Sequence, residues 1–280
     1  MKLRSLLFVP GDRPERMEKA LGLGADALIL DLEDAVAPDA KPAARAHVAA
    51  FLSRPRDHGV TLMVRINALG DTAAQQDLDA VMPARPDAIM LPKAEGAASI
   101  EAAVRLMAAG APVPILPIAP ETAGALFTMG DFPRVSGHLC GVTWGGEDLS
   151  TALGAVSSRD EHGVLTDASR LARVLALGAA AASGVPAIET VYPDFRDLDG
   201  LARFAAAARR EGFAGMMAIH PAQVPVINAA FTPDEAAIAH ARAVVQAFAD
   251  NPGKGVLTLN GKMIDMPHLK QARAILECAE

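Results

Sequence analysis

The sequence predicts an α/β protein built as a (β/α)8 barrel that carries a C-terminal helical and hairpin extension. Its 280 residues fit one barrel, which needs about 250 residues, or two domains of about 140. Short apolar runs alternate along the chain with longer helical patterns. These runs are continuous, as expected for parallel strands that are covered on both faces. A doubly wound sheet is the alternative, but no Gly-x-Gly-x-x-Gly follows the first expected strand.

Eight apolar runs have the length and composition of strands. They are Leu6–Val9, Ala27–Asp31, Leu62–Ile66, Ala88–Leu91, Pro114–Ile118, Leu139–Thr143, Pro186–Glu189 and Gly215–Ile219. Similar phrases, such as Gly24-Ala25-Asp26-Ala27 and Arg85-Pro86-Asp87-Ala88, precede several of them. This recurrence indicates repeated βα units, and about eight units make a barrel.

Helical patterns fill the intervals between these runs. They cover Pro14–Leu21, Pro42–Leu52, Ser99–Ala109, Asp167–Ala182 and Leu198–Glu211. Pro42 suits the first turn of its helix, where the missing N–H is not needed.

The pattern changes after residue 230. One long Ala-rich helix is expected over Pro233–Asp250, followed by a hairpin over Val256–Asp265 and a last helix over Pro267–Cys278. Asn260-Gly261 is the expected hairpin turn. We therefore assign residues 1–230 to the barrel and residues 231–280 to an extension that covers one end or packs on a neighbouring subunit.

Composition excludes several classes of protein. A content of 51% apolar residues is too high for a disordered chain. A net charge of −7 argues against nucleic acid as the main partner. No apolar run approaches the roughly 20 residues that span a bilayer, and the N-terminal run is too short for a signal peptide. Cys140 and Cys278 have no disulfide or zinc spacing. We expect a cytoplasmic protein.

Polar side chains follow the expected strands where a barrel places its active site. The residues concerned are Asp31, Glu33, Asp34, Arg65, Asn67, Lys93, Glu121, Glu147, Asp148, Glu189 and His220. Several carboxylates at one rim need a cation if they are to stay ionised. Mg²⁺, with Mn²⁺ as an alternative, is the simplest choice because hard cations take oxygen ligands.

Glu121 and Asp148 are the candidate metal ligands. They follow neighbouring strands, which lie roughly 4.8 Å apart, so both can reach one ion. Mg²⁺ takes one or two protein carboxylates and leaves positions for substrate. The spacing alone also allows Glu121 to lie in the first turn of a helix and Asp148 to be an N-cap.

Arg65 ends a buried strand, so its guanidinium needs an anionic partner. A carboxylate or enolate oxygen of a substrate would serve, as would a salt bridge to Asp31 or Asp34. Glu33 and Asp34 either support a metal through water or form a solvated loop pair.

Lys93 and His220 raise different chemistries. A barrel lysine can form a Schiff base, but Lys93 can pair with Glu33 or Glu95 instead, and this pairing is the favoured interpretation. His220 suits a general base or a helix cap. The remaining histidines show no zinc-ligand spacing.

The segment Val9–Lys19 has the pattern of a strand end, a glycine turn and a helix start. It carries Arg13, Arg16 and Lys19, and cations near a helix N-terminus suit a phosphate-bearing ligand. The alternative is a solvated basic face that Glu15 and Glu18 offset.

The ordered motifs resemble one family nearly end to end. They are Leu7-Phe8-Val9-Pro10-Gly11, Asp31-Leu32-Glu33-Asp34-Ala35-Val36, Val64-Arg65-Ile66-Asn67, Leu91-Pro92-Lys93, Glu121-Thr122, Gly146-Glu147-Asp148-Leu149, Ala218-Ile219-His220-Pro221-Ala222-Gln223 and Asn260-Gly261-Lys262-Met263-Ile264-Asp265. This set resembles the citrate lyase β-subunit-like branch of the HpcH/HpaI aldolases.

The resemblance implies a Mg²⁺-dependent barrel, usually trimeric or hexameric. Such enzymes cleave or form the carbon–carbon bond of 3-hydroxyacyl thioesters such as citramalyl-CoA or malyl-CoA, with an α-keto acid and acetyl-CoA as products. It implies that Glu121 and Asp148 bind the metal and that Arg65 acts with the metal at the reacting oxygens. It also implies that Asp265 completes a neighbouring subunit's site as general acid.

The same resemblance implies that Arg13, Arg16 and Lys19 hold the CoA phosphates. Glu189 stands where many relatives carry Asp, so we expect it to alter one side of the acyl pocket. Four other functions stay open: a malyl-CoA thioesterase or malate-synthase-like condensing enzyme, a β subunit that acts on a citryl-acyl carrier protein, a Lys93-dependent aldolase, and a ligand-binding barrel without catalysis.

Overall fold

The computed structural model describes residues 1–55, 58–70, 72–107 and 111–277. The predicted helix ends at Ala109 and Cys278 lie outside these residues. The chain forms two compact units, residues 1–228 and residues 229–280. Among the described residues, no helix is both long and apolar enough to cross a membrane.

The first unit is an α/β fold around one curled sheet of seven strands in the order β5-β4-β3-β2-β1-β7-β6. All neighbouring strands in it are parallel. The strands are β1 (Ser5–Pro10), β2 (Ala27–Asp31), β3 (Thr61–Arg65), β4 (Ala88–Leu91), β5 (Ile115–Pro117), β6 (Ile188–Glu189) and β7 (Gly215–Ala218). Seven of the eight predicted runs therefore form strands, with boundaries that differ from the prediction by at most two residues.

The eighth run, Leu139–Thr143, does not form a regular strand, which corrects the prediction. It makes isolated parallel bridges to both edges of the sheet, at Ile115 and Ile118 on one side and at Ala187 on the other. Its backbone N–H groups alternate between these neighbours: Cys140 donates to Ile115 over 3.0 Å and Val142 donates to Pro186 over 3.0 Å. Because the hydrogen bonds are shared between two sides, no continuous ladder forms with either.

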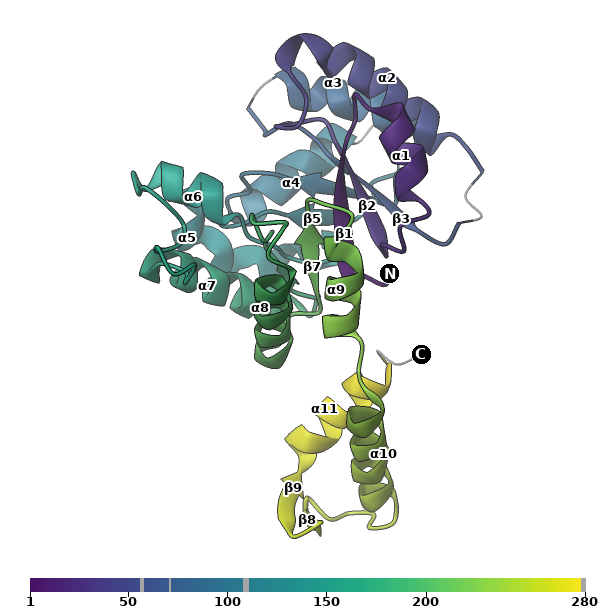
Figure 1. Ribbon diagram of the computed structural model, residues 1–280, viewed down its shortest axis with the longest axis vertical. Helices are drawn as coiled ribbons and strands as arrows, with labels where there is room; N and C mark the ends of the chain where they lie inside the picture. The colour runs from purple at the N-terminus through teal and green to yellow at the C-terminus, as the bar shows by residue number, and fades with distance from the viewer. Residues whose placement is uncertain (56–57, 71, 108–110, 278–280) are drawn as a thin grey trace. The chain divides into compact units, whose positions relative to one another are not determined.

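Helices lie on the outside of the sheet (Figure 1): α1 contacts β1, and α2 contacts both α1 and α3. The predicted helices correspond to α1 (Pro14–Ala20), α2 (Lys41–Leu52), α4 (Gly96–Leu106), α7 (Asp167–Ser183) and α8 (Leu198–Glu211). Several short elements were not predicted: α3 (Thr72–Val81), α5 (Ala125–Thr128), α6 (Gly146–Ala152), α9 (Gln223–Phe231) and the 3-10 turns η1 (Pro38–Ala40), η2 (Met82–Ala84) and η4 (Met129–His138). These are short, rich in polar residues, or interrupted by proline.

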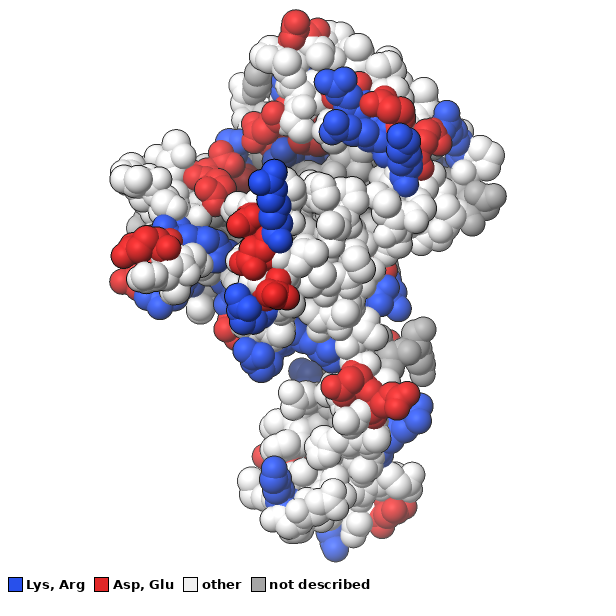
Figure 2. All heavy atoms as spheres, viewed as in Figure 1, with Lys and Arg blue, Asp and Glu red and all other residues white. Residues whose placement is uncertain are grey.

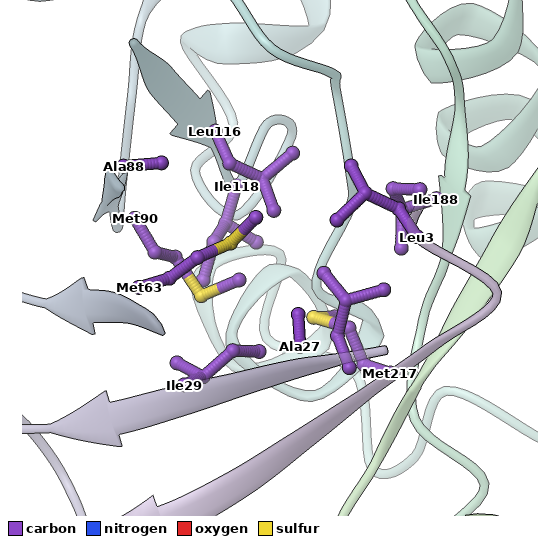
Figure 3. Packing of buried hydrophobic residues seen from close by; sticks show 11 residues of the cluster. Leu3, Ala27, Ile29, Met63, Ala88, Met90, Leu116, Ile118, Ile188 and Met217 are labelled. Atoms are coloured by element: carbon purple, nitrogen blue, oxygen red, sulfur yellow. The ribbon is translucent and has the colours of Figure 1, made fainter. Parts of the chain in front are cut away.

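Apolar side chains from neighbouring strands meet inside the curled sheet (Figure 3). Ala27 and Ile29 of β2 point into this core, as does Met63 of β3. Successive side chains of a strand point to opposite faces. The same alternation therefore carries Asp31 and Arg65 to the inner face, at the carboxyl ends of β2 and β3.

The second unit is a small helical unit with a hairpin. It contains α10 (Glu235–Ala249), β8 (Val256–Leu259), β9 (Lys262–Asp265) and α11 (Met266–Glu277), and β8 pairs antiparallel with β9. Asn260 and Gly261 have φ values of 51° and 76°, as a two-residue type I′ turn requires. The predicted hairpin and its turn are thus observed. Val244, Phe248, Ile264 and Leu269 form its apolar core.

Candidate active site

A pocket of about 900 Å³ opens at the carboxyl ends of the strands in the first unit. This volume is in the range of pockets that hold a drug-sized or cofactor-sized ligand. The family resemblance gives a binding or catalytic role to seven residues, and five of them line this pocket: Arg16, Lys19, Arg65, Glu121 and Asp148. The sheet therefore brings together residues that are up to 132 positions apart in the chain, from Arg16 to Asp148.

Arg65 is fixed in this pocket by two contacts to Asp31. Its Nε donates to Oδ1 over 2.8 Å and its Nη2 donates to Oδ2 over 2.6 Å. The Phe8 ring lies 4.8 Å from the guanidinium carbon and covers one face of it. Burial disfavours the charge, but the bond and charge of Asp31 outweigh this and hold the pKa of Arg65 above its usual range. The guanidinium is thus permanently charged and rigidly aimed.

The third nitrogen of Arg65 faces further carboxylates at the rim. Nη1 lies 3.0 Å from Glu33 Oε2 and 3.8 Å from Asp34 Oδ2. A salt bridge to Asp31 and contact with a substrate oxygen were the predicted alternatives for Arg65, and the geometry allows both. Asp31 binds one edge of the guanidinium, and Arg65 still lines the pocket.

Lys93 is held as an ammonium ion beside the same carboxylates. Its Nζ donates to Glu33 Oε1 over 2.7 Å and lies 3.8 Å from Asp148 Oδ1. Burial acts to lower the pKa of Lys93, but the bond and charge of Glu33 raise it overall. A Schiff-base lysine needs a lowered pKa. This geometry therefore disfavours the Lys93 aldolase and matches the pairing with Glu33.

Glu121 is a deeply buried carboxylate that lines the pocket, at 4% exposure. Its Oε2 accepts a 2.7 Å hydrogen bond from the Lys93 backbone N–H. Burial, followed by the negative charges of Asp148 and Glu33, raises the pKa of Glu121 to about 8. The residue lies in the turn before α5 (Ala125–Thr128) and outside that helix, so the helix-dipole alternative is wrong.

Asp148 lies in the first turn of α6 and faces the pocket. The N-cap of α6 is Gly145, which corrects the N-cap alternative for Asp148. Gly145 also touches the other candidate ligand, because a Cβ there would lie 2.5 Å from Glu121 Oε1. A side chain at position 145 would therefore force the Glu121 side chain to move.

These residues fit a hard, oxygen-binding cation such as Mg²⁺ better than a metal that prefers nitrogen or sulfur ligands. Within the described part of the chain, no group of three His, Cys, Asp or Glu side chains converges on one point, as in a metal site whose ligands all come from the protein. Mg²⁺ differs, since it takes one or two carboxylates and leaves the rest to substrate and water. A buried carboxylate whose pKa is raised to about 8 is a group that a cation would stabilise in its ionised form.

The cations of α1 lie at the side of the same pocket. Arg16 and Lys19 line it together with Ala20 and Leu23. Arg13 is exposed instead and its Nε lies 3.6 Å from Asp12 Oδ2. Figure 2 shows acidic and basic side chains close together around α1, so the patch is mixed in charge and only part of it faces the pocket.

His220 also lines the pocket, where its ring stacks on Phe195 at 4.8 Å. Its Nδ1 accepts a 3.2 Å hydrogen bond from the Ala222 backbone. The cap of the following turn comes from Gln223, whose Oε1 accepts from the backbone N–H of Ile219 and of His220.

Glu189 lies behind the pocket, in the packing between β6 and α7. Its side chain is fully buried, and its Oε1 accepts a 2.6 Å hydrogen bond from Trp144 Nε1 while Oε2 accepts a 2.5 Å bond from Arg173 Nε. Glu189 is not among the described residues that line the pocket. The expectation that it reshapes the acyl side of the pocket is therefore wrong, because its carboxylate is turned toward α7.

Asp265 belongs to the second unit. It ends β9, its side chain is 33% exposed, and its Oδ1 lies 2.5 Å from Nδ1 of His268. The hydrogen bond from His268 lowers the pKa of Asp265. Its predicted role depends on a neighbouring chain.

The sequence did not reveal a hydrogen-bond network that joins Lys41, Asn67 and Asp77 to the backbone after β2. Lys41 Nζ donates to the carbonyls of Leu32 and Glu33, over 3.1 Å and 3.2 Å, and also to Asn67 Oδ1. Asp77 Oδ2 accepts 2.8 Å and 2.6 Å bonds from Asn67. Asp77 shares the buried face of α3 with Ala74, Leu78 and Val81, and a carboxylate on an otherwise apolar helix face was the available signal.

Comparisons with known proteins agree on one family. Residues 4–221 match the model of the HpcH/HpaI aldolase/citrate lyase family. Mitochondrial citramalyl-CoA lyase from Rattus norvegicus is 36% identical over 99% of this chain and 86% of its own length. The (3S)-malyl-CoA thioesterase of Cereibacter sphaeroides is 37% identical over 99% of this chain and 94% of its own.

A solved structure supports the same relationship. The crystal structure of CitE from Mycobacterium tuberculosis, in complex with magnesium, acetoacetate and coenzyme A, is similar with a TM-score of 0.83 and 37% identity. The similarity covers 99% of this chain and 97% of that one.

Proposed function

The chain belongs to the HpcH/HpaI aldolase/citrate lyase family, and from this premise we propose that it is a Mg²⁺-dependent carbon–carbon lyase. Its substrate is a 3-hydroxyacyl-CoA thioester such as citramalyl-CoA or malyl-CoA, which it cleaves to an α-keto acid and acetyl-CoA or forms from them. The observation that carries the proposal is the convergence of Glu121, Asp148 and Arg65 in one pocket.

Glu121 and Asp148 are the residues that would hold Mg²⁺, or Mn²⁺ in its place. The bound ion supplies Lewis-acid chemistry, since it lowers the pKa of the substrate hydroxyl and stabilises negative charge. The chain contributes a fixed ligand, because Glu121 is held by the Lys93 backbone N–H.

Arg65 stabilises the oxygens on which negative charge develops when the carbon–carbon bond breaks. Its two bonds to Asp31 fix the guanidinium plane before substrate arrives. Little reorganisation is then needed during the reaction, which is what makes such a donor effective.

Arg16 and Lys19 supply positive charge for the phosphates of coenzyme A at the side of the pocket. Arg13 contributes from the exposed turn before α1. The apolar lining formed by Leu7, Leu23 and Ile219 suits the uncharged part of the thioester.

The sheet closes as a (β/α)8 barrel, with Leu139–Thr143 as the irregular eighth strand. The parallel bridges from this segment to Ile115, Ile118 and Ala187 support the closure. Residues 1–230 form this barrel, and residues 231–280 form an extension that packs on a neighbouring subunit of a cytoplasmic homotrimer or hexamer.

In that assembly Asp265 completes the site of the neighbouring chain. It acts as the general acid that protonates the thioester enolate carbon. Its position at the exposed end of a hairpin strand suits a residue that one chain presents to another.

A panel of CoA thioesters tests the reaction. Purified protein with Mg²⁺ is expected to release pyruvate from citramalyl-CoA or glyoxylate from malyl-CoA, and chelation is expected to abolish the release. If borohydride instead links pyruvate covalently to the protein, the result would support an aldolase that forms a Schiff base at Lys93. Unchanged Mg²⁺ affinity in Glu121→Ala would point to a ligand-binding barrel.

The 37% identity to a (3S)-malyl-CoA thioesterase favours hydrolysis as a second activity. The products separate the two reactions, because hydrolysis gives free malate and CoA whereas cleavage gives glyoxylate and acetyl-CoA. Activity of the lone chain on CoA esters would exclude an obligatory acyl carrier protein.

A further inference from the structure

Lys93 has a left-handed backbone conformation just after the end of β4. Its φ is 53°, in the region that glycine adopts freely and other residues adopt rarely. A lysine side chain does not favour this conformation, because the residues enriched there besides glycine have short polar side chains, as asparagine and aspartate do. The surrounding structure must therefore hold Lys93 in it.

The left-handed turn directs two successive backbone N–H groups to the same neighbour. The N–H of Lys93 donates to Oε2 of Glu121 over 2.7 Å, and the N–H of Ala94 donates to the carbonyl of Ile118 over 3.3 Å. Both acceptors follow β5, which lies beside β4 in the sheet. Successive N–H groups of an extended strand point to opposite sides, whereas a left-handed residue lets two of them converge. The conformation of Lys93 therefore allows its N–H to bind Glu121 while the next residue stays bonded to the end of β5.

The side chain of Lys93 is fixed at its far end as well. Its Nζ donates to Oε1 of Glu33 over 2.7 Å, and the Glu33 side chain is only 7% exposed. Glu33 is held from a second side, because Oε2 lies 3.0 Å from Nη1 of Arg65. Moving the lysine away would leave a buried carboxylate with one partner fewer, which is costly. The ion pair thus opposes a change of backbone conformation at Lys93.

We propose that Lys93 is a positioning residue for the metal ligand Glu121 and that it acts through its left-handed backbone. This inference rests on the proposed function, in which Glu121 holds Mg²⁺. The ion pair with Glu33 keeps the turn in place, the turn aims the N–H of Lys93, and the N–H fixes the Glu121 carboxylate. The lysine therefore has a role at the site that needs no chemistry of its amine.

Three substitutions separate the backbone of residue 93 from its ammonium group. Lys93→Gly, Lys93→Asn and Lys93→Ala all remove the ammonium, so its charge does not enter their comparison. They differ in how easily residue 93 adopts a positive φ, which is easiest for glycine, intermediate for asparagine and hardest for alanine.

Arg85 provides the matched control pair. Its φ of 52° is also left-handed, and it precedes β4 at the end of the strand opposite to Lys93. Arg85 is not among the described residues that line the pocket. Arg85→Gly and Arg85→Ala therefore make the same change in backbone preference at a distance from Glu121.

We expect Lys93→Ala to bind Mg²⁺ about 10-fold more weakly than Lys93→Gly, with Lys93→Asn between them, when calorimetry compares them at one fixed pH. Arg85→Ala and Arg85→Gly are expected to bind Mg²⁺ with the same affinity. In thermal unfolding without metal, the alanine variant of each pair is expected to have the lower Tm, because alanine is strained at a positive φ. A lower Tm is thus common to both positions, whereas the change in Mg²⁺ affinity is specific to residue 93.

Equal Mg²⁺ affinity of Lys93→Gly and Lys93→Ala would overturn the inference, since the backbone conformation would then not affect the metal ligand. An equally large difference within the Arg85 pair would overturn it as well. If Lys93→Ala fails to fold, Lys93→Asn takes its place, and an affinity equal to that of Lys93→Gly would contradict the positioning role.

The failure of the proposed function gives a different result. A wild-type protein that binds no Mg²⁺ would overturn both the proposed function and this inference. A wild-type protein that binds Mg²⁺ and cleaves no thioester contradicts the proposed lyase alone, because the affinities of the Lys93 variants still decide whether Lys93 positions Glu121.

Discussion

Asp31 and Arg65 are register partners on the neighbouring parallel strands β2 and β3, and their side chains form a two-point ion pair with bonds of 2.8 Å and 2.6 Å. Both residues end their strands on the inner face, directly above the apolar core. The register between β2 and β3 therefore places Asp31 beside Arg65, and the ion pair fixes the orientation of the Arg65 guanidinium in the pocket.

Arg65→Lys is expected to reduce kcat by about 10²–10³-fold, the effect of losing one oxyanion donor. A lysine cannot bridge both oxygens of Asp31, so its charge is no longer aimed. Steady-state kinetics on the active CoA thioester measures the loss. Arg4→Lys is the matched control, because Arg4 makes a similar two-point contact to Asp26 at the opposite strand ends. An Arg65→Lys enzyme with full kcat would remove Arg65 from the mechanism.

Mg²⁺ binding is expected to release a proton from Glu121 below pH 8, because its pKa in the metal-free protein is about 8. Affinity for Mg²⁺ should therefore increase from pH 6 to pH 8 and level off above. Calorimetry in buffers of different ionisation enthalpy measures the proton release. Glu121→Gln should bind Mg²⁺ weakly and lose the pH dependence, whereas Glu95→Gln should retain both. If the wild type binds Mg²⁺ with the same affinity from pH 6 to pH 8, Glu121 is not the group that releases the proton.

The stability of the metal-free protein is expected to depend on pH because Glu121 titrates. The folded pKa of Glu121 lies above the unfolded value of about 4.3. The contribution of Glu121 to the free energy of unfolding is therefore fully present below about pH 4.3, and it is lost as the pH rises toward 8. Thermal unfolding without metal should show Tm falling over this range more steeply in the wild type than in Glu121→Gln.

Gly145→Ala is expected to weaken Mg²⁺ binding without removing any ligand. The new Cβ would lie 2.5 Å from Oε1 and 2.6 Å from Cγ of Glu121, so the carboxylate must move. We expect a loss of affinity of about 10–100-fold, as when the support of a metal ligand is removed. Titration with Mg²⁺ measures it. Gly130→Ala, where the Cβ meets no atom within 4 Å, is the control, and equal affinity in both variants would show that Glu121 adapts.

Glu189→Gln is expected to destabilise the protein by about 3 kcal/mol, the lower part of the range for breaking a buried ion pair. The effect is limited because Arg173 also contacts Glu211. Urea unfolding measures the change. Asp167→Asn, in the exposed pair with Arg170, is expected to change stability by less than about 1 kcal/mol. A neutral Glu189→Gln would show that Trp144 and Arg173 find other partners.

The sequence predicted the strands of the first unit because continuous apolar runs are a local signal. It did not predict α3 or α6, where alanine, threonine and acidic residues give a weak pattern. It also placed a regular strand at Leu139–Thr143, since composition cannot reveal that a segment shares its hydrogen bonds between two neighbours.

The residues of the candidate site were likewise predicted only in part. Residue types at strand ends were sufficient to select Arg65, Glu121 and Asp148, all of which line the pocket. Residue types could not show that Glu189 turns away from the pocket toward Arg173. The direction of a side chain depends on a partner 16 residues away in sequence.

The sequence by itself determined the class of fold, the hairpin turn at Asn260-Gly261 and the group of polar residues from which a site is built, because these depend on local patterns of side chains. The tertiary structure alone decided the pairing of Asp31 with Arg65, the burial that raises the pKa of Glu121 and the contact of His268 with Asp265. Electrostatic interactions change steeply with distance and burial, and both are set by packing.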